Sequence, residues 1–165
     1  MNLDDYKQIP PLNLRTLCYL VQDNKVMLAM KKRGFGMGKY NGVGGKLEKG
    51  ETVLDAAKRE TFEEIGVNPT HLIEIAINDY YFPAKLEWNV RVIIFLCDKW
   101  EGKISESEEM KPYWFGFDDI PFDKLWDGDK YWLKQILSGI KIKGEFLMTE
   151  DNSKVAEISI KEIPS

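Results

Sequence analysis

Cysteine and histidine are scarce in this chain of 165 residues, which has two cysteines and one histidine. Cys18 and Cys97 stand inside apolar, strand-like runs and not at the spacing of metal ligands, so we expect buried, reduced thiols. A single histidine, His71, cannot build a histidine-rich metal centre. These shortages exclude a disulfide-stapled scaffold and a zinc site of the Cys/His type.

The sequence also lacks long apolar runs and a basic excess. No segment approaches the roughly 20 apolar residues that cross a bilayer, and the acidic, polar start "MNLDDYKQIP" does not resemble a secretory signal. The net charge is −4, which provides no general attraction for nucleic acids. We therefore expect a cytoplasmic protein whose partners include neither a membrane nor a nucleic acid polymer.

One domain accounts for most of the chain. Residues 1–13 are predicted to be a flexible lead-in, because Pro10 and Pro11 exclude a helix there, and residues 14–165 are predicted to form a single domain. Strands are expected at 14–22, 25–32, 71–82 and 88–100, and helices near 53–65 and 129–139. Asp23-Asn24 and Asp151-Asn152 are typical of hairpin turns. The pattern predicts an α+β fold with a mixed sheet.

The segment from Thr52 to Gly66 is the most informative in the chain. Thr52 and Asp55 match a helix N-terminal capping arrangement, and Gly66 suits the left-handed residue that ends a helix. On a helical wheel, three glutamates continue a stripe of small apolar residues: Glu60, Glu63 and Glu64 beside Val53, Ala56 and Ala57. Crowded, partly desolvated carboxylates favour a bound hard cation such as Mg²⁺. From the helix alone, an exposed acidic surface with an Arg59–Glu63 pair is an equal alternative.

A longer pattern surrounds this helix and favours the metal interpretation. Gly45 is followed after five residues by Glu51, and after seven more by Arg59-Glu60-x-x-Glu63-Glu64-x-Gly66-Val67. This arrangement resembles the Nudix box, the loop–helix–loop signature of hydrolases acting on nucleoside diphosphate derivatives. Thr61 stands where an aliphatic residue is usual.

The resemblance extends from about Thr16 to Met148. "MKKRGFGMGKYNGVGGK" and "SEEMKPYWFGFDDIPFDKLWDGDKYW" are similar to the MutT-homologue branch of the Nudix family, the oxidised purine nucleoside triphosphatases. The resemblance implies a mixed β-sheet packed between helices, an α/β/α sandwich. It also implies hydrolysis of 8-oxo-dGTP and similar nucleotides to the monophosphate and pyrophosphate, which removes damaged nucleotides from the pool.

The resemblance assigns the acidic residues a metal role. It implies that Mg²⁺, with Mn²⁺ as a substitute, is held by the Gly44 carbonyl and by four glutamates: Glu60, Glu63, Glu64 and Glu109. Glu51 and Arg59 would form an orienting ion pair within the catalytic machinery. Lys31 matches a residue that contacts the phosphate or ribose.

The resemblance also assigns a base pocket. Trp126 would stack on the purine, and Asn41 and Asp129 would read its hydrogen-bonding edge. Four further positions match residues lining the pocket, although each could equally belong to the core: Thr16, Phe35, Met110 and Met148. For Trp132 we predict core packing.

One position departs from the branch. Two adjacent acids are usual after the tryptophan, and here Gly128 occupies the first of these positions. Without a neighbouring acid, we expect Asp129 to ionise normally and to favour 8-oxo-dGTP over 2-oxo-dATP. Asp127 lies one residue early and could replace the missing acid if the loop shifts.

Two other functions stay open at this stage. The chain could be a Nudix hydrolase for undamaged nucleotides or ADP-ribose, or a catalytically silent Nudix fold that binds nucleotides. The intact set of box glutamates argues against the silent form. We expect a monomer acting on a small nucleotide substrate.

Overall fold

The computed structural model describes residues 1–9 and 13–164. The strands are β1 (Asn13–Gln22), β2 (Lys25–Lys31), β3 (Tyr40–Asn41), β4 (Val43–Lys46), β5 (Asn68–Tyr81), β6 (Val90–Glu101), β7 (Met110–Gly116), β8 (Ile142–Met148) and β9 (Val155–Glu162). The α-helices are α1 (Leu3–Tyr6), α2 (Val53–Ile65) and α3 (Leu133–Leu137). Three short 3₁₀ helices are η1 (Leu86–Trp88), η2 (Phe122–Lys124) and η3 (Asp127–Tyr131).

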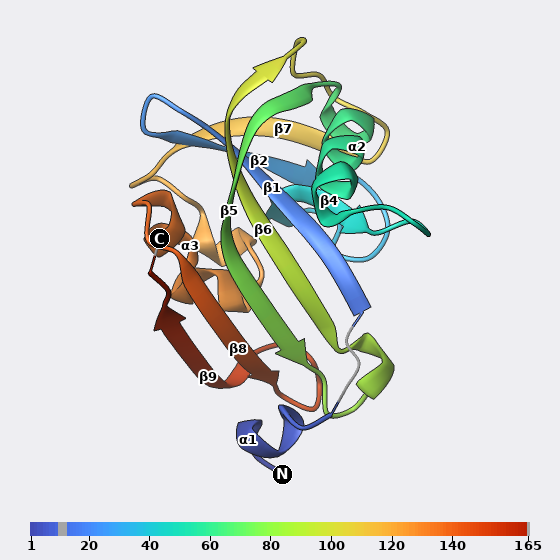
Figure 1. Ribbon diagram of the computed structural model, residues 1–165, viewed down its shortest axis with the longest axis vertical. Coiled ribbons are helices and arrows are strands. Elements are labelled where there is room, and N and C mark those ends of the chain that lie inside the picture. The colour runs from blue at the N-terminus through green and yellow to red at the C-terminus, as the bar shows by residue number, and fades with distance from the viewer. Residues whose placement is uncertain (10–12, 165) are drawn as a thin grey trace.

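The strands form one mixed sheet of nine strands, in the order β3-β2-β1-β6-β5-β8-β9, with β4 paired to β1 and β7 to β2. The pairs β1–β6 and β5–β8 are parallel, and the other pairs are antiparallel. Helix α2 packs against β1, β4 and β5, and α3 lies near β8 and β9 at the other end of the sheet (Figure 1). The predicted α+β fold with a mixed sheet between helices is confirmed.

The continuous apolar run around Cys18 is explained by the position of β1, which has a core cluster on each face. Tyr19 joins one core cluster, which includes Trp132 and Phe146. Its neighbours Cys18 and Leu20 join a second cluster with buried residues of β2 and α2. Successive residues of a strand point to opposite faces, so β1 is buried on both sides. The two cysteines are free and buried, as predicted.

Local turn chemistry sets two hairpins. Asp23 and Asn24 both have positive φ (53° and 58°) and join β1 to β2, which is the backbone of a tight two-residue hairpin turn. Asn152 likewise has φ 62° in the connection between β8 and β9. Both predicted hairpins are confirmed.

Two expectations differ from the structure. The predicted flexible lead-in contains α1, capped by Asn2, and the buried side chains of Leu3 and Tyr6 pack against Tyr81 and Leu147. These apolar contacts order a segment whose sequence is mainly polar. The expectation for Pro10 and Pro11 lies outside the described residues.

The predicted helix at 129–139 is two elements, η3 and α3. They are separated by Trp132, whose φ of −136° departs from helical values while its side chain is buried in the core. Gly139 ends the segment at φ 89°, as its position suggested. Within the described residues, none of the helices has the length and apolar character needed to span a bilayer.

Candidate active site

Helix α2 begins and ends where the sequence predicts. The Thr52 side chain accepts a hydrogen bond from the Asp55 backbone N–H at 3.1 Å, and Gly66 adopts a left-handed conformation with φ 80°. Ala56 and Ala57 are fully buried, so the helix lies close to the sheet. This packing directs the acidic residues of its last turns to the edge of the interface.

Two adjacent glycines of β4 make room for this approach in different ways. A Cβ atom on Gly44 would stand 1.8 Å from the Thr16 carbonyl oxygen on β1, so only glycine fits between the strands. A Cβ atom on Gly45 would instead stand 2.6 Å from Oε1 of Glu60. Gly44 therefore serves the sheet, whereas Gly45 clears the space that one carboxylate occupies.

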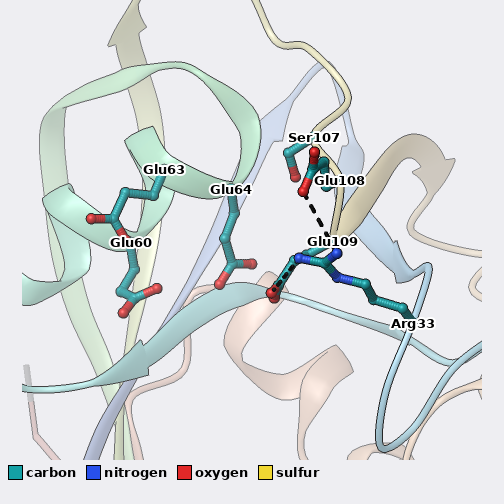
Figure 2. Close-up of a pocket in the computed structure, with 7 residues that line it drawn as sticks. All are labelled: Arg33, Glu60, Glu63, Glu64, Ser107, Glu108 and Glu109. Carbon is teal, nitrogen blue, oxygen red and sulfur yellow. Dashed lines mark hydrogen bonds and ion pairs between the residues drawn. The ribbon is translucent and has the colours of Figure 1, made fainter.

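The carboxylates line one pocket of about 350 Å³. Figure 2 shows Glu64 extending from α2 toward Glu109, which lies just before β7, whereas Glu60 and Glu63 lie on the far side of Glu64, away from Glu109. The residues lining the pocket are Arg33, Glu60, Glu63, Glu64, Ser107, Glu108 and Glu109. The structure thus brings together the four glutamates that the sequence assigned to the metal, from segments over 40 residues apart.

Glu64 has the environment expected of a cation ligand. Burial raises the pKa of its carboxyl to about 8, with a further contribution from the nearby charge of Glu60, while the backbone amide of Gly44 acts in the opposite direction. Its Oε2 atom is buried and has no hydrogen-bond partner in the described part of the chain. An unpaired carboxylate oxygen beside other carboxylates fits a divalent cation such as Mg²⁺, which takes oxygen ligands.

Arg59 occupies part of the acidic cluster. Its guanidinium donates to Glu51 (2.7 and 3.0 Å), to Glu60 (2.9 Å), to Glu63 (3.2 Å) and to the Lys46 carbonyl oxygen (3.1 Å). Hydrogen bonding to Arg59 lowers the pKa of Glu51 to about 2, and the same contact raises the pKa of Arg59. The predicted Glu51–Arg59 pair is present.

The Arg59–Glu63 contact of the alternative interpretation is present as well. Arginines contact Glu60 and Glu109, and no three His, Cys, Asp or Glu side chains of the described chain lie together as a ready-made metal centre. The Arg59–Glu63 pair of the alternative interpretation is therefore a real contact, and the metal interpretation stays a prediction. The partnerless oxygen of Glu64 is what distinguishes this helix from an ordinary solvated acidic surface.

Two residues that the resemblance assigned to the base pocket, Phe35 and Trp126, meet at the loop that follows β2. Phe35 is 75% exposed, yet its ring stacks on Trp126 with centroids 5.4 Å apart and an interplanar angle of 28°. Gly36 lies against the same indole, since a Cβ atom there would come within 2.8 Å of it. The ammonium group of Lys39 is 5.3 Å from the Trp126 ring centroid. Phe35 and Trp126 are thus neighbours, as the resemblance implied.

Asn41 is held in one orientation by a residue that the sequence analysis missed. Its Oδ1 atom accepts hydrogen bonds from the Gly42 backbone N–H (2.8 Å) and from the buried Tyr19 hydroxyl (3.1 Å). A backbone N–H can only donate, so the side-chain oxygen must face it and the amide NH₂ points elsewhere. No local pattern marks Tyr19, because its neighbours on β1 are equally apolar.

The expectation that Asp129 ionises normally is wrong. The residue is 5% exposed, and burial raises the pKa of its carboxyl to about 7, although the charge of Lys39 opposes the shift. Its Oδ2 atom has no hydrogen-bond partner among the residues that the structure describes. Burial is the largest cause of this raised pKa, and the charge of Asp127 adds to it, although Gly128 occupies the position of the adjacent acid.

Asp127 does not take the place left by Gly128. It accepts hydrogen bonds from the Val155 backbone N–H (2.9 Å) and from Lys130 (3.1 Å), which lower the pKa of its carboxyl. Gly128 itself is buried among Val155, Tyr80 and Phe146. In the described part of the chain, the loop therefore presents one acid with a partnerless oxygen, Oδ2 of Asp129.

The remaining residues that were predicted to line the pocket differ in their burial and in the elements that they contact. Thr16 is buried beside Gly45 on the paired strand, and its hydroxyl is unpartnered in the described residues. Lys31 ends β2 opposite Met110, which packs against the core cluster around Cys18. Met148 is buried at the end of β8. Trp132 packs in the core, as predicted, although its indole N–H has no partner in the described chain.

Arg33 is the second residue that the sequence analysis missed. It lines the acidic pocket, and its guanidinium reaches Glu109 at 3.3 Å. The run Lys31-Lys32-Arg33 in an otherwise acidic chain was the available signal, because three consecutive cations beside a glycine-rich loop suggest an anionic ligand.

Comparison with known proteins agrees with the geometry. The family model described as "NUDIX domain" matches residues 11–136. The oxidized purine nucleoside triphosphate hydrolase of Mus musculus is 41% identical over 152 residues, covering 92% of this chain and 96% of that protein. The protein of the same name from Danio rerio is 44% identical, covering 81% and 85%. A crystal structure of the MutT protein from Bacillus halodurans superposes with a TM-score of 0.78 at 25% identity, covering 91% of this chain and 98% of that one.

Proposed function

This chain belongs to the Nudix family, and from that premise we propose that it is a divalent-metal-dependent hydrolase of oxidised purine nucleoside triphosphates. With 8-oxo-dGTP, water would cleave the triphosphate to give 8-oxo-dGMP and pyrophosphate, which removes a damaged nucleotide from the pool. The two relatives named for this activity match most of the chain, and their similarity supports this choice of substrate.

The observation that carries the proposal is the buried Oε2 atom of Glu64, which has no hydrogen-bond partner among the described residues and belongs to a pocket lined by other glutamates. Such a group is unfavourable in a protein that only folds, because burial without a hydrogen-bond partner destabilises the charged form and raises the pKa of the carboxyl. It becomes favourable when a cation binds. Retention of all the box glutamates argues against a catalytically silent fold.

The acidic residues would divide the work between ligation and positioning. Glu60, Glu63, Glu64 and Glu109, with the Gly44 carbonyl, would hold Mg²⁺ or Mn²⁺. When bound, the ion would neutralise phosphate oxygens and make a water molecule more nucleophilic. Arg59 and Glu51 would fix the position of Glu60, because the guanidinium donates to both carboxylates.

The base would be recognised where the loop between β2 and β3 meets the segment that carries Trp126 and Asp129. Trp126 offers an aromatic face of the kind on which any purine stacks. Asn41 would present its NH₂ group as a donor, since Tyr19 and Gly42 occupy its oxygen. Asp129 would read the remaining edge with its unpaired oxygen. Lys31 would contact the phosphate or ribose, and Thr16, Phe35, Met110 and Met148 would shape the pocket.

We further infer that the protein acts as a monomer in the cytoplasm, where free nucleotides are available. The proposed reaction requires two partners, a divalent cation and a small nucleotide.

A substrate panel tests the proposal. The purified protein is incubated with Mg²⁺ and 8-oxo-dGTP, 2-oxo-dATP, dGTP or ADP-ribose, and the products are separated by ion-exchange chromatography. We expect kcat/KM for oxidised purine triphosphates to exceed that for dGTP, with pyrophosphate as the product. Faster cleavage of ADP-ribose or dGTP than of both oxidised nucleotides would contradict the proposed substrate class.

A further inference from the structure

Arg33 places a positive charge in the pocket that the proposed function assigns to a metal ion, and the inference below rests on that function. Among the seven residues lining this pocket in the described chain, Arg33 alone is basic. Its Nη2 atom lies 3.3 Å from Oε1 of Glu109, and its Nη1 atom lies 3.6 Å from Oε2 of Glu108 (Figure 2). The guanidinium therefore stands where a cation would compete for the same carboxylates.

These contacts have the features of a pair that can exchange partners. The side chains of Arg33 and Glu109 are 59% and 54% exposed, and both distances are longer than those of a tight charged hydrogen bond. Exposed pairs of this kind contribute little to stability. Arg59, in contrast, is 21% exposed and makes a short contact of 2.7 Å with Glu51, so its position is committed to the fold.

The backbone beside Arg33 is anchored by hydrogen bonds, whereas its side chain is held by two exposed ion pairs. The Lys32 backbone N–H donates to the Glu109 carbonyl oxygen at 2.8 Å, and its ammonium group donates to the Ser107 carbonyl oxygen at 2.9 Å. Gly34 follows with φ 77° and begins the loop that carries Phe35 to Trp126. Arg33 is thus held at the junction between the acidic pocket and the base site, with freedom only in its side chain.

We propose that Arg33 is an exchangeable counter-ion, which pairs with Glu109 in the metal-free protein and turns to the triphosphate of the substrate once a divalent cation takes Glu109. The cation supplies the charge that the carboxylate loses, so the guanidinium is released beside the phosphates. A guanidinium suits this second role because its planar donors match phosphate oxygens. Arg33 is thereby a positioning residue for the polyphosphate and a competitor of the metal.

The two roles predict opposite effects of one substitution. Arg33→Met keeps the apolar stem and removes the charge. In the nucleotide-free protein, Mn²⁺ followed by electron paramagnetic resonance should bind about two- to fivefold more tightly, because no guanidinium competes for Glu109. At saturating Mg²⁺, KM for 8-oxo-dGTP should rise about tenfold, because a charged hydrogen-bond donor is lost. Arg33→Lys should restore part of the KM.

Lys25→Met is the matched control. Lys25 is exposed at the opposite end of β2, so the substitution changes the net charge equally without touching the pocket. It should leave the Mn²⁺ affinity at the parent value. Unchanged or weaker Mn²⁺ binding by Arg33→Met, relative to the parent and to Lys25→Met, would overturn the proposal. The Mn²⁺ titration uses no nucleotide, so its outcome is separate from whether 8-oxo-dGTP is the substrate.

Discussion

Asp129 provides the sharpest test of how this site reads a base. Its carboxyl is buried, its Oδ2 atom has no hydrogen-bond partner among the described residues, and its pKa of about 7 leaves the charged and neutral forms comparably populated at neutral pH. The charged form only accepts hydrogen bonds, which suits the N–H groups of an oxidised guanine. The neutral form can also donate, which suits an adenine-type edge. A single buried acid can therefore serve both oxidised bases, and the preference expected from Gly128 should hold only at high pH.

The magnitude follows from titration of one group. Between pH 6 and pH 8, a group with a pKa of about 7 changes from about one-tenth to about nine-tenths ionised, and the neutral fraction changes in reverse. The ratio of kcat/KM for 8-oxo-dGTP to that for 2-oxo-dATP should therefore rise about a hundredfold across this range. Measuring the ratio cancels groups that act on both substrates alike, such as Glu64 in the acidic pocket.

Asp129→Asn supplies the control, because the amide has the same shape and does not titrate. Its ratio should not vary with pH, and its kcat/KM for 8-oxo-dGTP should fall about ten- to hundredfold, as expected when a charged hydrogen-bond partner is removed. A flat ratio between pH 6 and pH 8 in the parent protein would refute the reasoning, since it would mean that Asp129 does not change charge while it contacts the base.

Three further predictions concern other parts of the site. Glu64→Gln should reduce kcat by orders of magnitude, yet raise the stability of the metal-free protein at pH 7.5 by about 1–3 kcal/mol in thermal or urea unfolding. The sign follows because the folded state binds more protons than the unfolded state between pH 4.5 and about pH 8, so the carboxyl lowers the stability of the parent protein as pH rises through this window. Equal stability of parent and variant with a chelator present would contradict this. Gly44→Ala should lower the free energy of unfolding by about 3 kcal/mol, because its Cβ atom would clash with the Thr16 backbone. Gly45→Ala should keep the melting temperature and lose activity, because its Cβ atom would displace the Glu60 carboxylate. Identical behaviour of the two variants would show that the glycines do not divide these roles. Tyr19→Phe should lower kcat/KM for oxidised purines about three- to tenfold, because loss of one hydrogen bond of about 1 kcal/mol frees the Asn41 side chain. The Mg²⁺ concentration that gives the half-maximal rate should not change. A shift in this Mg²⁺ concentration would show that Tyr19 does not act through base recognition.

Several features of this protein could be read from local sequence because local chemistry decides them. The ends of α2 depend on Thr52, which binds an N–H three residues away, and on Gly66, which tolerates a left-handed backbone. The turn at Asp23-Asn24 likewise needs only two residues that accept positive φ. The spacing of the box glutamates on α2 follows from the helical repeat, so their shared face was predictable as well.

Other features depend on contacts between distant segments, and only the tertiary structure decided them. The Arg33–Glu109 pair joins residues 76 positions apart, and the Tyr19 hydroxyl orients an amide 22 positions away. Helix α1 is held by contacts of Leu3 and Tyr6 with Tyr81 and Leu147, and the polar N-terminal sequence does not reveal these contacts. The ionisation of Asp129 is the clearest case. The residue type sets an ordinary acidity, but burial beneath the packed chain removes the water that stabilises its charge, and no spacing of neighbouring residues encodes that burial.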